Sequence, residues 1–503
     1  MPPITCAGPW TPARRPDMAP VKTRLKVLLA ASEMVPYCKT GGLADVVGAL
    51  AAYLPPHVDL AVFLPRYKAL RQNDTFAALD DDFVVPLAGQ KERVRLFKNA
   101  SVFLVDHPLF DREGLYGIGG RDHPDNARRF TLFSRAVLEG AKSIGFKPDI
   151  IHGHDWQTGL IPAYLKTLYA QDAFFHRTGS LITIHNIAYQ GVFPQETLRD
   201  TGLPPEDFHM HKLEFYGQMN FLKAGLVYAD YISTVSQNYA REIKNSKDKG
   251  AGLEGVLLAR RDVLTGILNG IDTNIWNPQT DPYLSANYDP VKNIGGGLTI
   301  KTQNKTKLQK TLGLKPDPKV FFLGMVSRLD PQKGIDWAIE VLPRFLGEGA
   351  VQAVILGTGD PAYEKAAKEL SRRHGKSFKA VFEFNDPLAH QIYAASDGFL
   401  MPSRFEPCGL GQMIAMRYGA LPIVAQTGGL ADTVTPDKGF LMDDSTAAGL
   451  SRAIVQALDC YQKDPSRWKI MVKQAAQTDF SWAASIKRYL ELYRLAQTKV
   501  AAS

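Results

Sequence analysis

The sequence has few of the features that mark secreted, membrane-spanning or zinc-binding proteins. Its 503 residues include four cysteines, Cys6, Cys38, Cys408 and Cys460, and none of them is paired by spacing with another. This scatter argues against a disulfide framework or a zinc site and favours a reducing compartment. We expect the cytoplasm, with a plastid as the lesser alternative. No apolar run approaches the length of a bilayer-spanning helix, so no membrane association is expected.

Several catalytic signatures are missing as well. There is no GxSxG nucleophile elbow and no complete GxGxxG dinucleotide motif. His152-Gly153-His154-Asp155 could suggest metal ligands, but no third ligand follows at a useful spacing. The carboxylates Asp45, Asp155 and Glu406 lie too far apart in the sequence to be nominated as a glycosidase pair. We therefore expect neither a metal nor an organic cofactor.

The charge is unevenly distributed but does not indicate a nucleic-acid binder. The formal net charge is +8, and residues 1–26 carry half of it. This Pro-rich segment lacks the apolar stretch of a secretory signal, so a disordered leader is expected over residues 1–23. The remaining charge is dispersed, without a basic stripe interleaved with aromatic residues. A small anionic ligand fits this pattern better than nucleic acid does.

What the sequence does contain is a regular alternation of strand-like and helical segments. A chain of this length indicates two or three domains, and the alternation predicts βαβ units with parallel sheets. We expect one doubly wound domain over residues 24–278, a second over 279–480 and a terminal helix over 481–503. Residues 279–303 carry turn formers, including Gly295–Gly297, and are expected to be a linker or a surface insertion.

The expected strands follow from short apolar runs bounded by turn formers. In the first domain they are Leu25–Ala31, Asp59–Leu64, Val94–Phe97, Ser101–Val105, Pro148–His152, Ser180–His185, Tyr231–Val235 and Thr265–Leu268. In the second they are Val320–Val326, Val351–Leu356, Lys379–Phe384, Asp397–Met401 and Leu421–Ala425. The glycine-rich and charged stretch 110–126 is expected to be a long functional loop. Residues 480–495 have an apolar stripe at helical spacing, which indicates packing rather than catalysis.

The hexamer TGGLAD occurs twice, as Thr40–Asp45 and as Thr427–Asp432. Each copy follows an apolar strand and leads into a helix. The carboxyl ends of parallel strands are where open α/β sheets bind ligands, and a helix N-terminus there can hold an anion. The alternative is that these glycines only make tight turns. The segment 401–434 places Arg404, Glu406 and Cys408 beside the second copy, which favours a binding site.

Cations stand beside these turns. Lys39 precedes the first one, and Arg328 and Lys333 lie five residues apart after a strand, on a loop held by Pro331 and Gly334. Two cations at this spacing could hold a diphosphate; the alternative is a solvated surface pair. A diphosphate leaves readily when its developing charge is stabilised, so such an enzyme needs cations and dipoles rather than a proton-donating acid.

Long sequence blocks follow one another from about Leu25 to the terminal helix: KTGGLADVVGAL, HGHDWQTGLIP, TIHNIAYQGVFP, FLKAGLVYADYISTVSQNYAREI, GILNGIDTNIWNP, MVSRLDPQKGID, GTGDPAYE, MPSRFEPCGLGQMIAMRYG and TGGLADTV. In these blocks and in their order the sequence resembles bacterial glycogen synthase and plastid starch synthase. The resemblance implies the GT-B fold, in which two Rossmann-like doubly wound domains face a cleft and the last helix crosses back to the first domain. It also implies transfer of glucose from ADP-glucose to the non-reducing 4-hydroxyl of an α-1,4-glucan (glycogen or a maltooligosaccharide), with retention and without metal.

The resemblance assigns roles to residues that match the family's motifs. The catalytic set it implies is Glu406, Arg328, Lys333, His185 and Asp45. The donor-binding set it implies is Lys39, Gly41, Gly42, Phe384, Cys408, Gly409, Leu410, Thr427 and Gly428. Within these sets Arg328 and Lys333 neutralise the diphosphate, and His185 meets the 6-hydroxyl of the sugar. Asp155 lies on the acceptor side, and the Phe384 ring lies against adenine.

The sequence departs from the family pattern at a few positions. Gly411 stands where relatives usually carry a small hydroxyl residue, and Ala425-Gln426 replaces a more basic pair. Ile414 stands eight residues after Glu406, where a second glutamate would complete the related EX7E pattern. Two alternatives therefore stay open: a glycosyltransferase of the same fold that prefers UDP-glucose or a small acceptor, and a non-catalytic glucan-binding homologue. Oligomeric state is not predicted.

Overall fold

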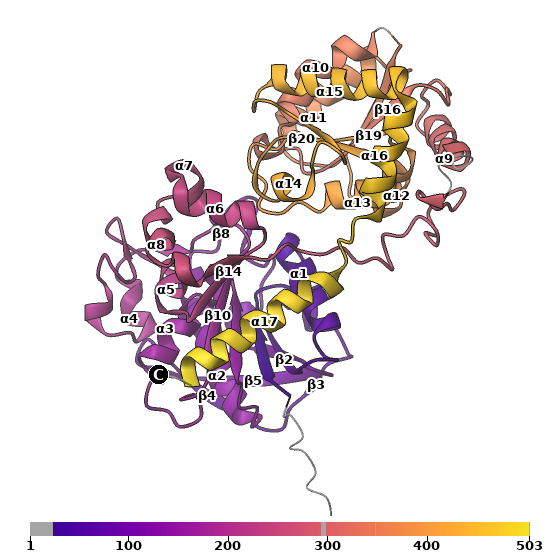
Figure 1. Ribbon diagram of the computed structural model, residues 1–503. Coiled ribbons are helices and arrows are strands. Elements are labelled where there is room, and N and C mark those ends of the chain that lie inside the picture. Colours follow the sequence, from indigo (N-terminus) through magenta and orange to yellow (C-terminus); the bar gives the residue numbers. More distant parts are fainter. Residues whose placement is uncertain (1–23, 293–297, 348, 502–503) are drawn as a thin grey trace, which may run out of the picture.

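The computed structural model describes residues 24–292, 298–347 and 349–501. The leader expected at 1–23 and the glycines Gly295–Gly297 lie outside these ranges. Figure 1 shows two lobes, one built from β1 to β15 and the other from α9 to α16, and the chain ends with a helix that lies on the first lobe. The expected α/β class with two parallel sheets is confirmed.

The first lobe is built on a ten-stranded sheet with the order β15-β14-β10-β9-β1-β2-β6-β5-β3, and β4 pairs with β5. The strands from β15 to β6 are parallel and buried on both faces, which explains their continuous apolar runs. Their bounds are β1 Lys26–Ala30, β2 Asp59–Pro65, β6 Val102–Asp106, β9 Ile150–His154, β10 Gly179–Ile184, β14 Tyr231–Thr234 and β15 Leu264–Gly266.

An antiparallel edge extends this sheet and was only partly predicted. β5 (Gln90–Asn99) is longer than the expected Val94–Phe97, and it pairs with β3 (Ala77–Ala78) and β4 (Phe83–Leu87). In β5 exposed charged and polar residues interrupt the apolar positions, and β3 has only two residues, whereas β4 is an apolar run that was not predicted as a strand. The remaining short strands are β7 Gly117–Ile118, β8 Arg121–Asp122, β11 Val192–Phe193, β12 Glu214–Phe215 and β13 Gln218–Asn220.

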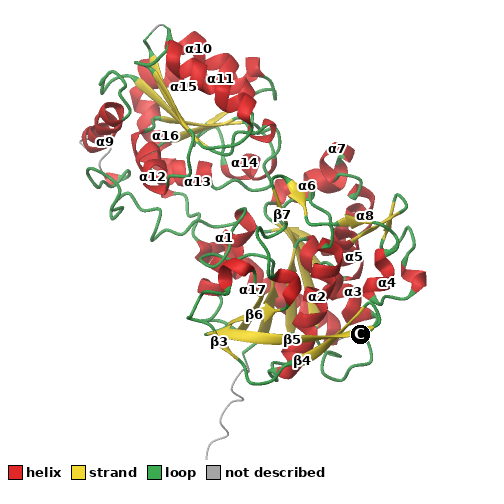
Figure 2. Ribbon diagram, turned by 180° about the vertical axis from the view of Figure 1, so that it is seen from behind, coloured by secondary structure: helices red, strands yellow, loops and turns green. Residues whose placement is uncertain are grey.

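Helices cover both faces of the first sheet, as the view from behind shows (Figure 2). Their bounds are α1 Gly42–Tyr53, α2 Asn126–Ser143, α3 Leu160–Lys166, α4 Thr197–Thr201, α5 Phe221–Tyr228, α6 Gln237–Asn245, α7 Lys247–Gly250 and α8 Glu254–Ala259. α6 begins where Ser236 accepts a hydrogen bond from the Tyr239 amide, an N-cap that the sequence S-x-x-Y supplies.

The second lobe has a six-stranded parallel sheet with the order β18-β17-β16-β19-β20-β21. The strands are β16 Phe321–Val326, β17 Val351–Leu356, β18 Phe378–Val381, β19 Gly398–Met401, β20 Leu421–Val424 and β21 Phe440–Leu441. Its helices are α9 Leu298–Thr311, α10 Ile335–Leu346, α11 Pro361–Arg373, α12 Asp386–Ala395, α13 Gly411–Arg417, α14 Gly428–Thr433, α15 Ala447–Lys463 and α16 Pro465–Gln477. In both lobes the loops after the parallel strands therefore share one edge of a sheet.

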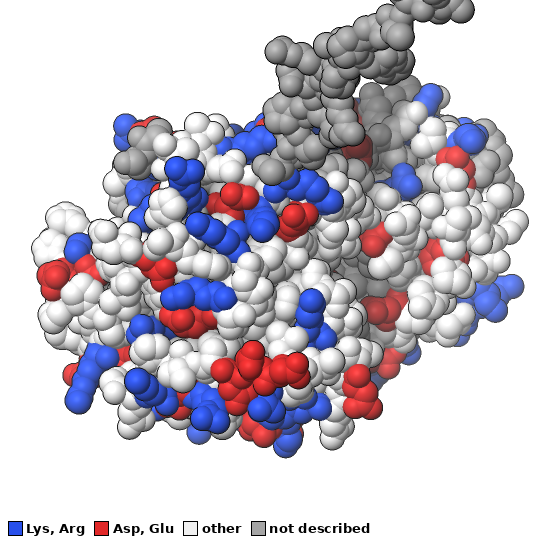
Figure 3. All heavy atoms as spheres, turned by 90° about the horizontal axis from the view of Figure 1, so that it is seen from below, with Lys and Arg blue, Asp and Glu red and all other residues white. Residues whose placement is uncertain are grey.

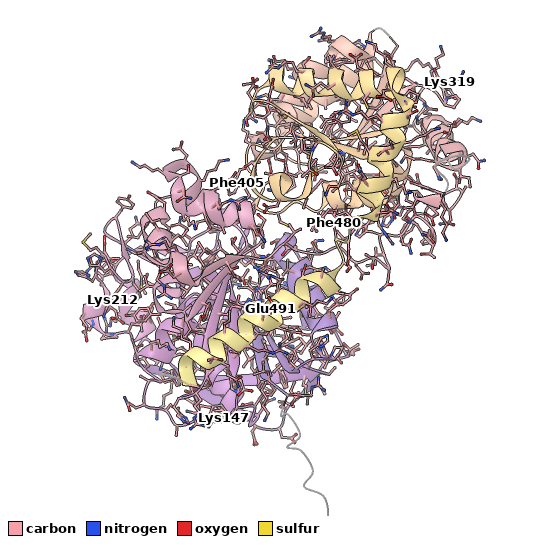
Figure 4. The ribbon with its side chains drawn as sticks, in the orientation of Figure 1. Lys147, Lys212, Lys319, Phe405, Phe480 and Glu491 are labelled. Atoms are coloured by element: carbon pink, nitrogen blue, oxygen red, sulfur yellow. The ribbon has the colours of Figure 1, made fainter. Side chains whose placement is uncertain are left out.

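The terminal helix α17 (Trp482–Ala501) returns to the first lobe and packs against α1, β9 and β10. Phe480 marks the point where the chain leaves the second lobe, and Glu491 lies on the solvent side of the helix (Figure 4). The predicted apolar stripe is the buried face: Trp482, Ile486, Tyr489 and Tyr493 are at most 4% exposed. The last element of the chain thereby completes the core of the first lobe.

Replacing Ile486 by alanine tests this packing. We expect the free energy of unfolding to fall by about 2–5 kcal/mol, because a buried side chain is removed and a cavity remains. Urea unfolding followed by circular dichroism measures it. Leu495→Ala on the same helix is the control, because Leu495 is 53% exposed and should change stability by no more than about 0.5 kcal/mol. Equal losses in both variants would contradict the docking of α17.

The expectation of a linker or surface insertion at residues 279–303 is wrong for the last part of this segment, which belongs to a helix, while residues 279–290 contain no helix or strand and only two of them are buried. Asp281 is 1% exposed and accepts hydrogen bonds from Tyr418 Oη (2.6 Å) and, on the same oxygen, from His390 Nδ1 (2.7 Å). α9 begins at Leu298, and buried Lys301 donates to the carbonyl of Ala394 at 2.9 Å. These polar residues resemble a surface segment in the sequence, but in the fold they satisfy buried groups of α12 and α13.

Charged side chains of both signs are mixed on the surface, as the dispersed charge of the sequence predicts. On the face seen in Figure 3, lysines and arginines are interspersed with acidic residues and form no stripe of one sign. None of the described helices is both long enough and apolar enough to span a bilayer.

Candidate functional site

A cavity of about 560 Å³ opens where the two lobes meet. It is lined by loops that follow β1, β9 and β10 in the first lobe and β16 and β19 in the second. Ten of the predicted site residues line it: Gly41, Gly42, Asp155, His185, Arg328, Lys333, Glu406, Cys408, Gly409 and Leu410. The cavity thus lies at the carboxyl ends of both sheets, where α/β folds bind ligands.

A carboxylate and an ammonium group form the second-lobe wall of the cavity. Glu406, on the loop after β19, is 6% exposed, and its Oε2 lies 2.5 Å from Nζ of Lys333. Ser403 donates its hydroxyl to the same oxygen at 3.1 Å. Lys333 is held by a turn in which Gly334 adopts φ +66°, and a Cβ there would lie 2.1 Å from the carbonyl of Pro402. A paired, nearly buried charge is thereby fixed at the cavity wall.

Arg328 is the more exposed cation of this wall. Its side chain is 60% exposed, and its guanidinium lies 3.1 Å from Asp330. It also lines a smaller adjoining cavity of about 260 Å³ together with Lys333, Glu406 and Gly411. Arg328 and Lys333 therefore both line the two cavities, Lys333 as a largely buried cation and Arg328 as a solvated one.

Asp155 and His185 form the facing first-lobe wall. They follow the adjacent strands β9 and β10, and the His185 amide donates to Asp155 Oδ1 at 2.7 Å. Burial raises the pKa of Asp155 to about 8 and lowers the pKa of His185 to about 3. Both groups are therefore uncharged at neutral pH. His185 lines the cavity although only 9% of it is exposed.

The HGHD motif does not form a metal site in the described part of the chain. His152 hydrogen-bonds Tyr493 at 2.9 Å and Thr183 at 2.6 Å, and His154 bonds His185 at 3.0 Å. Within residues 24–292, 298–347 and 349–501, no group of three or more His, Cys, Asp and Glu side chains could hold a metal ion.

Asp155→Asn is expected to remove a pH effect near 8 while keeping most of the activity at pH 7. Below its pKa the Asp155 carboxyl is neutral, like an amide, and Asn still accepts the His185 hydrogen bond. Asn also tolerates the positive φ of +57° at this position. In the wild type, ionisation above pH 8 adds a buried negative charge beside Glu33, so KM for an anionic donor should rise.

The same substitution has a stability readout with a defined sign. Because the pKa of Asp155 is raised from 3.8 to about 8 in the folded state, its protonated form stabilises the fold. This contribution to the free energy of unfolding is complete below pH 4 and is lost as pH rises to 8. The variant should therefore have the higher Tm at pH 8 and should lose the pH dependence of KM. If KM changed with pH in the same way for the wild type and the variant between pH 6 and 9, the pH effect would not come from ionisation of Asp155.

The first glycine turn is occupied by a carboxylate that the sequence analysis missed. Glu33, 3% exposed, accepts hydrogen bonds from the amides of Thr40 and Gly41 and, at 2.9 Å, from the Thr40 hydroxyl. Tyr116, from the expected functional loop, donates to the same carboxylate at 3.0 Å. Glu33 lies three residues beyond β1, so its place after a parallel strand is the signal that could have found it. The turn is therefore hydrogen-bonded to the Glu33 side chain, and Gly41 and Gly42 still line the cavity.

Lys39 and Asp45 were predicted at the donor and catalytic positions, but neither lines the cavity. They form an ion pair with each other at 2.8 Å, with side chains 44% and 32% exposed. Opposite charges on either side of one turn neutralise each other here, which the linear spacing does not show.

The second glycine turn packs closely against the loop that carries Glu406. Gly428 adopts φ +44°, and a Cβ there would lie 1.9 Å from the carbonyl of Glu406. A Cβ at Gly429 would lie 2.1 Å from the carbonyl of Cys408, and the Gly429 amide donates to Glu406 O at 3.0 Å. The glycines allow α14 to pack directly under the loop that carries Glu406.

Thr427 and Gly428 line neither of the two cavities described above, and their phosphate contact stays a prediction. Their polar groups meet Glu242 of the first lobe, which accepts from the Gly428 amide at 3.1 Å. Lys249 donates to Thr427 Oγ1 at 3.2 Å. The two identical hexamers differ in their contacts because different elements pack against them.

The same edge joins the lobes. Ser236, the N-cap of α6, donates to the carbonyl of Pro407 at 2.6 Å, and the Asn238 amide donates to Asp432 at 2.7 Å. Phe405 lies at this junction (Figure 4), with its ring 5.3 Å from that of Tyr239. The loop of Glu406 is thus held by both lobes.

The Cys408-Gly409-Leu410 segment lines the cavity as predicted, with Gly409 at φ +72°. Burial raises the pKa of the Cys408 thiol to about 12, so it stays protonated and is not a nucleophile at neutral pH. Gln412 donates to the carbonyls of Cys408 (3.1 Å) and Gly409 (2.9 Å) and fixes this segment.

Phe384 does not contribute to either cavity. Its side chain is 85% exposed, beyond the end of β18, and it lines neither the larger nor the smaller space. The expected strand Lys379–Phe384 ends earlier, at Val381, so this ring projects from a loop.

Two family models match the chain, one for each lobe. The starch synthase catalytic domain matches residues 26–259, and the group 1 glycosyl transferases match residues 304–475. The glycogen synthase of Elusimicrobium minutum is 44% identical over 484 residues, which cover 93% of this chain and 99% of the relative. This chain belongs to the glycogen and starch synthase family. The glycogen synthase of Syntrophotalea carbinolica is 45% identical, with 94% of this chain and 99% of the relative covered.

Solved structures agree with the family assignment. The catalytic domain of starch synthase IV from Arabidopsis thaliana, bound to ADP and acarbose, has a TM-score of 0.83 at 33% identity and covers 95% of this chain and 100% of its own. Sucrose-phosphate synthase from Thermosynechococcus elongatus, at 19% identity and a TM-score of 0.55, covers 95% of this chain and 100% of its own and shows the fold alone. The predicted GT-B fold and glycosyltransferase class are confirmed.

Proposed function

We propose that the protein is a retaining glucosyltransferase that moves glucose from ADP-glucose to the non-reducing 4-hydroxyl of an α-1,4-glucan in the cytoplasm. The observation that carries this proposal is the cavity in which Arg328, Lys333 and Glu406 face His185 across the two lobes, in a chain of this family. The similar catalytic domain of starch synthase IV is bound to ADP and acarbose, which supports an adenine nucleotide donor and a saccharide acceptor for this chain.

The second lobe stabilises the leaving group in this proposal. As the glycosidic bond to the diphosphate breaks, negative charge grows on the departing oxygen while positive charge develops at the glucosyl carbon. Arg328 and Lys333 stabilise the diphosphate. Lys333 has three N–H donors, so it can keep its bond to Glu406 and still contact a phosphate oxygen. With two cations at the leaving group, the reaction proceeds without a metal ion.

Glu406 and the first lobe position the sugar. The Glu406 carboxylate is fixed by Lys333 and Ser403, so it can accept hydrogen bonds from glucose hydroxyls and offset positive charge at the reacting carbon. In the described part of the chain the side-chain partners of the Glu406 carboxylate are Lys333 and Ser403 rather than a second carboxylate, and attack of the acceptor on the face vacated by the diphosphate accounts for retention. Closure of the lobes excludes water, which would otherwise compete with the glucan hydroxyl.

The test is nucleotide release by the purified full chain from ADP-glucose and from UDP-glucose, each with and without glycogen, and with EDTA added. We expect glycogen-dependent ADP release that EDTA does not change, and new α-1,4 linkages in the anomeric proton spectrum. Faster release from UDP-glucose would overturn the donor assignment. Release that does not depend on glycogen would overturn the acceptor assignment.

A further inference from the structure

A row of three buried histidines leads from the terminal helix to the cavity. His152 on β9 bonds Tyr493 of α17 at 2.9 Å, and its ring centroid lies 4.1 Å from that of His154. His154 Nδ1 lies 3.0 Å from His185 Nε2. His152 and His154 are 0% exposed, and His185 alone of the three lines the cavity. The proposed reaction uses His185 but leaves the role of His154 unexplained.

The surroundings of one atom, His154 Nε2, decide which ring nitrogen of His154 carries the proton. His154 Nε2 is buried and has no hydrogen-bond partner in the described part of the chain. Burial and the neighbouring rings hold the pKa of His154 well below its usual value, so the ring is neutral and carries one N–H. A neutral imidazole donates from one nitrogen and accepts at the other.

Two arrangements satisfy the bond between His154 and His185. With the proton on His154 Nε2, a buried N–H would be left without an acceptor. With the proton on Nδ1, only a lone pair is left unused. Orphaned buried N–H groups are rarer than under-used acceptors, since an unmade donor bond loses its hydration entirely. The proton therefore belongs on His154 Nδ1, which donates to His185 Nε2.

We propose that His154 is a positioning residue that fixes the tautomer of His185, so that His185 Nδ1–H is a permanent hydrogen-bond donor toward a sugar hydroxyl in the cavity. The identity of this acceptor rests on the proposed function, whereas the tautomer does not. A fixed donor recognises an oxygen lone pair on the substrate, and it cannot take up a proton at that nitrogen.

The direct test is NMR of the full chain with ¹⁵N-labelled histidine and no substrate. Two-bond ¹H–¹⁵N correlations report which ring nitrogen carries the proton, and His154→Asn and His185→Asn assign the two spin systems. We expect Nδ1–H for both residues between pH 6 and 8. His57, exposed on the first lobe, is an internal reference for a ring free of such constraint. A proton on Nε2 of either residue overturns the proposal, and because no substrate is present the result is independent of the proposed reaction.

A matched pair of variants tests the consequence for binding. His154→Asn keeps a short side chain with an N–H donor, whereas His154→Phe keeps a ring without one. We expect the Asn variant to retain the His185 tautomer and a KM within about threefold of the wild type. The Phe variant should lose the single tautomer and raise KM for the sugar nucleotide about tenfold, with kcat changing less. Equal KM values in the two variants, with His185 still locked in both, would overturn the positioning role.

Discussion

Replacing Lys333 by methionine is expected to lower kcat about 10²–10³-fold, with a smaller change in KM. The reason is that the ammonium stabilises charge that appears only as the diphosphate leaves, so its loss affects the transition state more than the bound substrate. Methionine keeps an unbranched side chain of similar length at this position, which is 18% exposed. Steady-state rates of ADP release measure the effect. Lys319→Met is the control, because Lys319 lies at the outer edge of the second lobe (Figure 4).

A double variant separates two roles of Lys333. If Lys333 only neutralised Glu406, then Lys333→Met should have little further effect once Glu406 is already Gln. If Lys333 also serves the leaving group, the double variant should be clearly slower than Glu406→Gln alone. A double variant as active as Glu406→Gln alone would remove Lys333 from the leaving-group role.

Gly429→Ala should disable the enzyme from a position that does not line the cavity. The new Cβ would lie 2.1 Å from the carbonyl of Cys408, so the loop that carries Glu406 must move. We expect a loss of about 1–3 kcal/mol in stability from overpacking and a fall in kcat of about 10²-fold from the displaced carboxylate. Thermal unfolding and ADP release measure the two effects.

The first copy of the hexamer supplies the matched control. Gly42 occupies the position that corresponds to Gly429, and a Cβ there meets nothing within 4 Å. At the start of α1, alanine should leave stability unchanged or raise it by up to about 1 kcal/mol. Similar destabilisation of both variants would show that the two turns have the same structural role, contrary to the packing described above.

Much of the architecture could be predicted from local pattern. Strands such as β1, β9 and β16 are buried on both faces and appear in the sequence as continuous apolar runs between turn formers. The edge strand β3 could not be predicted this way because it has only two residues, whereas the apolar run Phe83–Leu87 could have revealed β4. α9 was not predicted, because its lysines suggest a surface segment. In the fold Lys301 is buried against the carbonyl of Ala394 and Lys305 against Asp397, each about 90 positions away in the chain.

The site, too, has parts that local sequence predicts and parts that depend on distant contacts. The sequence by itself determined the family, the two parallel sheets and the loops after strands that supply Arg328, Lys333, Glu406, Asp155 and His185, since strand ends are set by local composition. Only the tertiary structure decided which of two identical hexamers opens to the cavity, and that Lys39 pairs with Asp45 while Phe384 projects into solvent. The physical reason is that a glycine turn or a charged side chain acquires its role from the neighbours packed against it. Those neighbours, such as Glu242 beside Gly428, come from distant parts of the chain.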